Sequence, residues 1–217
     1  KKIFWNEPLE INLSCSDSEK IELLNNFVLI SKIDGNNANI VLNPAELGMG
    51  TVSLTPVAYR NNGKEKIIGE TLNIEIIPPK ALPALIILKN EKCKDGMLLS
   101  LESEGKETKL LAYSEQKKLD ISIIPESAKF AVEGFFEAET DGIYQFQIKS
   151  EGLEIEDFLV DQLKTGFPLQ NKPWLYLAVN LSKGIHKFKM TAKRGNFGDL
   201  DIRFGNRGTR KIKSFVQ

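Results

Sequence analysis

The chain has 217 residues, of which 29 are basic and 29 are acidic, so its formal net charge at pH 7 is zero. A balanced charge gives nucleic acid and anionic membrane surfaces no bulk electrostatic attraction, and neither is expected as a partner. No run approaches the roughly eighteen apolar residues that a membrane span needs. The length suits two domains, each with its own core.

Short apolar runs alternate with turn-forming residues through the first third of the chain. Asn25-Asn26, Asp34-Gly35 and Asn61-Asn62-Gly63 separate these runs, and such residues tolerate positive φ angles or cap their own backbone. The runs predict strands over residues 9–15, 21–24, 27–33, 40–42, 52–59 and 71–77. This density of short strands predicts a small β-sandwich.

The segment Asn43-Pro44-Ala45-Glu46-Leu47-Gly48-Met49-Gly50 precedes the last strand pair of this region. It resembles a loop of the immunoglobulin-like modules found in bacterial envelope proteins. The resemblance implies an immunoglobulin-like β-sandwich over residues 1–77, although the paired inter-sheet cysteines of antibody domains are missing. Cys15 continues the inward-facing series of its strand and is expected to be a buried free thiol.

Three prolines follow within six residues, at Pro78, Pro79 and Pro83. Proline lacks a backbone donor and favours an extended, semi-rigid chain. Residues 78–84 are therefore predicted to be a linker between the two domains.

The second part of the chain contains the clearest strand pattern, two runs joined at Asp141-Gly142. Tyr144, Phe146 and Ile148 alternate with polar residues, as in a half-buried antiparallel sheet. Further strands are predicted over residues 84–89, 97–102, 109–113, 119–124, 129–139, 142–150, 156–160, 175–181, 184–193 and 200–205. Helical periodicity is missing, so the predicted fold class is all-β, with two β-sandwiches in tandem.

Three motifs give this part a family resemblance: Gly142-Ile143-Tyr144-Gln145-Phe146, Ser150-Glu151-Gly152 and Leu181-Ser182-Lys183-Gly184-Ile185-His186. Together they resemble the protective-antigen-type (PA-fourteen) domains of bacterial glycosidases, adhesins and toxins. The resemblance implies a jelly-roll-like sandwich over residues 85–217 and a secreted, periplasmic or cell-surface location. It also implies association with carbohydrate.

Carbohydrate-binding members of that family carry adjacent aspartates that hold calcium, which in turn binds sugar hydroxyls. Here the paired aspartates are absent. Glu151, Glu154, Glu156 and Asp157 form the candidate metal site, in a segment predicted as an acidic loop. The alternative is a solvated strand edge whose charges block unwanted pairing. No cofactor is therefore expected, and calcium is left open.

His186 is the single histidine, which excludes histidine-rich metal centres and most nucleophilic triads. It lies in phase with the inward residues Phe188 and Met190, so a packed, hydrogen-bonded side chain is expected. The carboxylates fall on polar strand positions or in turns, where an acid with a raised pKa is not expected. The chain is therefore predicted not to be an enzyme.

The candidate ligand-binding residues are Phe167, Trp174, Asn196 and Phe197, because they fall in segments expected to be loops. Aromatic rings there could stack on sugars, or they could plug the open ends of the sandwich. The expected function is a non-catalytic accessory module of an exported bacterial protein that binds glycan. The alternative is a structural spacer that packs against a neighbouring domain of a larger protein.

Overall fold

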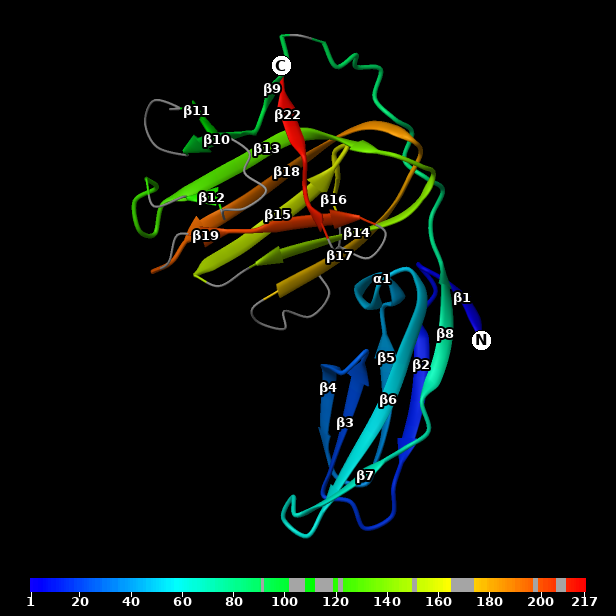
Figure 1. Cartoon of the computed structure of the whole chain (residues 1–217). Coiled ribbons are helices and arrows are strands. Elements are labelled where there is room, and N and C mark those ends of the chain that lie inside the picture. Colours follow the sequence, from blue (N-terminus) through cyan, green and yellow to red (C-terminus); the bar gives the residue numbers. More distant parts are fainter. Residues whose placement is uncertain are drawn as a thin grey trace. The chain divides into compact units, whose positions relative to one another are not determined.

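The computed structural model describes residues 1–90, 92–101, 108–111, 119–120, 123–149, 152–164, 174–196, 199–205 and 210–217 (Figure 1). The described chain divides into two compact units, Lys1–Pro79 (unit 1) and Lys80–Gln217 (unit 2). The regular structure of the described residues is strand apart from one four-residue helix, which confirms the predicted all-β fold class. No helix among the described residues is long and apolar enough to span a membrane.

Unit 1 is built from two facing sheets. The larger sheet has the order β1 (Lys2–Phe4), β8 (Leu72–Ile77), β6 (Gly50–Arg60), β3 (Lys20–Asn25) and β4 (Val28–Asp34), and β7 (Glu65–Ile68) also pairs with β6. The second sheet pairs β2 (Leu9–Ser14) with β5 (Asn37–Leu42). Alternate residues of both sheets, among them Leu9, Leu23, Leu54 and Ile74, meet in one core. This strand order is compatible with the immunoglobulin-like interpretation, which stays a prediction.

The short helix α1 (Pro44–Leu47) precedes β6, within the segment that carries the envelope-module resemblance. Asn43 caps it by accepting a hydrogen bond from the Ala45 N–H at 3.2 Å, and Pro44 occupies the first turn, where its missing donor costs nothing. Cys15 and Cys93 are free thiols. Cys15 lies just beyond β2 and is half-buried, so its predicted full burial is wrong.

Unit 2 is also layered. Its larger sheet has the order β11 (Thr108–Leu111), β10 (Met97–Leu101), β13 (Lys129–Ala138), β18 (Gly184–Arg194), β15 (Leu153–Val160) and β16 (Leu163–Lys164). In the same sheet, β22 (Ser214–Val216) pairs with β13 and with β9 (Lys94–Asp95).

The second sheet of unit 2 has the order β17 (Trp174–Leu181), β14 (Gly142–Lys149), β20 (Ile202–Gly205) and β21 (Arg210–Lys211). The pair β12 (Leu119–Asp120) and β19 (Asp199–Leu200) lies outside both sheets. Phe136 and Phe146, from opposite sheets, meet edge to face with ring centroids 5.4 Å apart. This contact lies in one apolar core between the sheets, the arrangement of a β-sandwich.

The proline-rich boundary differs from the prediction in one respect. Leu82, expected in the linker of residues 78–84, belongs to unit 2: its N–H donates to the Asn180 carbonyl at 2.9 Å, and its own carbonyl accepts from the Ser182 N–H at 2.9 Å. Leu85 follows by donating to the Ile185 carbonyl at 2.7 Å. The strand predicted over residues 84–89 is wrong, because Leu85 makes an isolated backbone pair and no continuous ladder follows.

Candidate functional site

The ends of the strands in unit 2 define two opposite rims of the sandwich. At one rim, β17 begins at Trp174, which pairs with Lys149 at the end of β14. Beside them β18 ends, and the Gly195 N–H donates to the Gly152 carbonyl at 2.8 Å. We call this the Trp174 rim. The Ser182 rim lies at the other end and contains the turn that joins β17 to β18.

The candidate ligand residues belong to the Trp174 rim as far as the structure describes them. Asn196 is exposed and lies one residue beyond Gly195. Trp174 is the first residue of β17 rather than a loop residue, which corrects the prediction. Phe167 and Phe197 lie outside the described residues. Strand register therefore brings the backbone of Trp174 and Asn196 to the same end of the sandwich.

Strand β15 (Leu153–Val160) contains the predicted strand 156–160 and begins three residues earlier, within the segment predicted as an acidic loop. Glu154, Glu156 and Asp157 lie on β15, which pairs with β18, and Glu151 lies outside the described residues. A bulge between Ile155 and Asp157 keeps both Ile155 and Phe158 buried, although they are three residues apart.

The three described carboxylates of this segment do not gather around a common point. Glu156 makes an ion pair with Lys129 at 2.6 Å, and Glu154 lies opposite Lys193 on β18. Within the described residues, no three His, Cys, Asp or Glu side chains are arranged to hold a metal ion. The geometry fits the solvated-strand alternative, and calcium stays an untested possibility.

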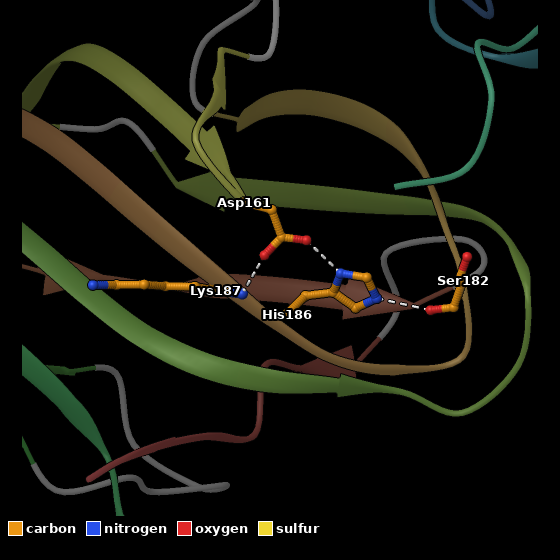
Figure 2. Close-up of polar contacts among 4 residues, drawn as sticks. All are labelled: Asp161, Ser182, His186 and Lys187. Carbon is orange, nitrogen blue, oxygen red and sulfur yellow. Dashed lines mark hydrogen bonds and ion pairs between the residues drawn. The ribbon is translucent and has the colours of Figure 1, made fainter. Parts of the chain in front are cut away.

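The Ser182 rim holds a buried polar cluster made by Asp161, His186 and Ser182 (Figure 2). His186 Nδ1 lies 2.5 Å from Asp161 Oδ2, and His186 Nε2 lies 2.7 Å from the Ser182 carbonyl oxygen. The imidazole is fully buried, and the Asp161 side chain is 9% exposed. The prediction of a packed, hydrogen-bonded His186 is confirmed.

The turn between β15 and β16 places the Asp161 carboxylate. Asp161 and Gln162 have φ angles of 48° and 69°, as the central residues of a tight hairpin turn. The Asp161 N–H donates to the Lys187 carbonyl at 2.9 Å, and its Oδ1 accepts from the Lys187 N–H at 2.8 Å (Figure 2). The hydrogen bonding between β15 and β18 thus extends one residue beyond the end of β15, to Asp161.

The hydrogen-bond partners of His186 bear on its protonation state. A carbonyl oxygen can only accept, so Nε2 must carry a proton, and the Asp161 carboxylate accepts the proton on Nδ1. Burial by itself would lower the pKa of His186, but the hydrogen bonds to Asp161 and Ser182 and the Asp161 charge outweigh it and raise the pKa. The surroundings of His186 therefore favour its protonated form over the neutral one.

Unit 1 contains a smaller polar cluster on its larger sheet. Glu22 accepts hydrogen bonds from Lys20 Nζ at 2.7 Å and from the Tyr59 hydroxyl at 2.8 Å. The Lys20 hydrogen bond is the main reason why the pKa of Glu22 is lowered. Lys20 and Glu22 are partly exposed and mutually paired on β3, so together with Tyr59 of β6 they form a surface cluster rather than an acid–base pair.

No family model matches the chain, and no curated protein matches it. Among solved structures, an anti-sigma factor domain-containing protein is 10% identical with a TM-score of 0.42, covering 95% of this chain and 81% of that one. A putative membrane anchored protein from Corynebacterium diphtheriae is 9% identical with a TM-score of 0.30, covering 99% and 54%. The CBM51-2 and INT domains of Clostridium perfringens ZmpB, in complex with GlcNAc, are 11% identical with a TM-score of 0.25, covering 78% and 38%.

These neighbours are β-rich, like this chain. Their identities and TM-scores establish neither a family nor a function. None of them is a protective-antigen-type domain, so that resemblance stays a prediction.

Proposed function

We propose that the chain is a non-catalytic accessory module of an exported bacterial protein and that the Trp174 rim of unit 2 binds glycan. The non-catalytic part of this proposal rests on the Asp161–His186–Ser182 cluster, which is buried and whose imidazole nitrogens both have partners. Both imidazole nitrogens are already engaged in hydrogen bonds within the protein, and no imidazole surface is exposed. Such a histidine has neither a free lone pair nor access to a substrate, as a general base requires.

The glycan part rests on the Trp174 rim. Register places the start of β17 and the exposed Asn196 at one end of a rigid sandwich, which is where binding residues usually lie. An indole can stack on a sugar ring, and a carboxamide can both donate to and accept from sugar hydroxyls. These two residue types suit a neutral, hydroxyl-rich ligand.

The test is binding of the full chain to an array of neutral bacterial and plant glycans, with and without calcium. Trp174→Ala and Asn196→Ala should each weaken the retained signal at least tenfold. Lys183→Ala is the matched control, because Lys183 is exposed on the opposite rim. Equal binding by the parent protein and Trp174→Ala would remove the site, and a response to calcium alone would revive the acidic segment.

A second proposal, a structural spacer, is supported by exposed apolar side chains near the start of unit 2. Ile86 and Leu88 are 103% and 83% exposed, and they belong to an extended segment without strand partners. Side chains of this kind are typical of surfaces that pack against another domain. If this proposal holds, Ile86→Ser with Leu88→Ser will reduce binding of a hydrophobic dye to the folded protein, and the glycan array will stay blank.

A further inference from the structure

The buried ion pair of unit 2 is connected by hydrogen bonds to the stretch that leads from unit 1. His186 holds the Ser182 carbonyl, and the Ser182 N–H donates to the Leu82 carbonyl at 2.9 Å. The Leu82 N–H in turn donates to the Asn180 carbonyl at 2.9 Å. The turn between β17 and β18 is therefore the shared support of His186 and Leu82.

We propose that Asp161 and His186 form a proton-operated clamp that holds residues 82–85 against the turn between β17 and β18. The clamp is closed when the imidazole carries both protons. It opens when one proton leaves, and the attachment of Leu82 loosens with it.

The geometry determines which contact is lost. A carboxylate is a stronger acceptor than a carbonyl, so a neutral His186 keeps the proton on Nδ1 toward Asp161. The lone pair of Nε2 then faces the Ser182 carbonyl oxygen across 2.7 Å, and the two acceptors repel each other. The peptide between Ser182 and Lys183 has to move away from the ring.

That peptide is also held from its other side. The Lys183 N–H donates to Asp141 Oδ1 at 2.6 Å, from the turn between β13 and β14. A rotation that relieves the repulsion at the Ser182 carbonyl therefore strains the Asp141 contact as well. The displacement is passed to the neighbouring Ser182 N–H, which is the donor to Leu82.

The charged groups around His186 come from each element packed against it. Asp161 contacts the imidazole directly from the turn between β15 and β16. Asp141 and Lys183 meet at the neighbouring turns, and Lys187 on β18 pairs through Nζ with Glu133 of β13 at 3.2 Å.

His186 also has an apolar ring contact. From β13, the ring of Phe136 lies 5.8 Å from the imidazole, centroid to centroid. The Asp161 carboxylate is therefore the acidic group in direct contact with the imidazole, and the pKa of His186 is raised, so opening is expected at a higher pH than for an ordinary histidine.

The test uses the full chain labelled with ¹⁵N and ¹³C and titrated by NMR from about pH 6 to about pH 10, a range that brackets a histidine raised above its usual value. The His186 ring signals report the proton, and the Leu82 and Ser182 amide signals report the clamp. We expect the amide signals to shift with the same midpoint as the ring. Amide signals of Leu82 and Ser182 that stay constant while the ring titrates would overturn the proposal.

Two variants separate the clamp from general loosening. Asp161→Asn keeps an acceptor but removes the charge, so the common midpoint should fall by about one pH unit or more. Asp141→Asn weakens the same turn without touching the imidazole, and its midpoint should stay within about 0.3 of the parent value. Equal shifts in the two variants would contradict the clamp. If Asp161→Asn does not fold, the parent protein alone decides whether the proposal holds: the His186 ring signals and the Leu82 and Ser182 amide signals must then share one midpoint.

Discussion

The ring of Tyr144 lies flat on the ring of Phe204, with centroids 4.8 Å apart and an interplanar angle of 5°. Tyr144 belongs to β14 and Phe204 to the neighbouring strand β20. The Tyr144 hydroxyl donates to the Thr140 carbonyl at 2.8 Å and accepts from the Thr140 N–H at 3.0 Å. One side chain thus joins the sheet to the turn between β13 and β14.

Tyr144→Phe should destabilise unit 2 by about 1–3 kcal/mol. The ring stack is retained, but both backbone groups of Thr140 lose their partner in a part-buried place. Chemical denaturation followed by intrinsic fluorescence measures the change, because each unit contains one tryptophan, Trp5 and Trp174. A transition unchanged in the Trp174 signal would show that water replaces the hydroxyl without loss.

Gly184→Ala should be more damaging than Gly142→Ala. Both glycines have φ angles that alanine rarely adopts, 134° and 145°. A Cβ on Gly184 would lie 2.5 Å from Ala84 Cβ, whereas a Cβ on Gly142 would meet nothing within 4 Å. The difference in unfolding free energy between the two variants therefore isolates the contact with the stretch around Ala84.

Combining each of these changes with Ala84→Gly sharpens the comparison. Part of the loss in Gly184→Ala should be recovered, because the clashing methyl group is gone, while Gly142→Ala should gain nothing. Equal losses for Gly184→Ala and Gly142→Ala would mean that residues near Ala84 do not press on the turn between β17 and β18.

Phe27→Gly should stabilise unit 1 by about 1 kcal/mol. Asn26 and Phe27 have φ angles of 47° and 71° in the turn between β3 and β4, and the second position of such a turn favours glycine. The Phe27 side chain is 96% exposed, so its removal costs almost no packing. The measurement is the unfolding midpoint seen through Trp5, with Phe27→Ala as the control that removes the ring but keeps a Cβ. A destabilised Phe27→Gly would show that the ring packs on unit 1.

The stability of unit 2 should decrease as the pH rises above neutrality. A histidine whose folded pKa is raised stabilises fully below its unfolded value of about 6.5, and it loses this contribution as the pH rises through the folded pKa. Unfolding free energies measured between about pH 6 and pH 10 should show this decline in the parent protein and a flatter curve in His186→Gln. Parallel curves for the two proteins would rule out His186 as the source of the pH dependence of stability.

Alternation alone was enough to predict the hairpin of β13 and β14, because a period of two and an Asp-Gly turn point to the same structure. The same rule predicts only part of β15. The bulge leaves Ile155 and Phe158 both inward and breaks the period, so the predicted strand covers residues 156–160 and the residues before it are predicted as a loop. Whether a strand carries an extra residue depends on its pairing with the neighbouring strand, here β18. A local sequence pattern holds no information about that pairing.

The segment Ala84–Lys89 shows the opposite error. Its apolar residues have high strand propensity, yet within this segment only Leu85 pairs with a strand, so propensity predicts a strand that the fold does not pair. For His186, the phase of β18 predicted burial correctly. Its partner Asp161 lies 25 residues away, and the pairing of β15 with β18 brings them together.

The hydrogen bonds of Leu82 and Leu85 also determine how early in the chain a separately folding fragment of unit 2 has to begin. A polypeptide trimmed to begin at Ile86 would lack the donors for the Asn180 and Ile185 carbonyls and the acceptor for the Ser182 amide. Its sandwich would keep every strand of both sheets. It would lack the backbone hydrogen bonds that residues of the proline-rich stretch make with β17 and β18. The smallest autonomous version of this half of the molecule therefore includes Leu82.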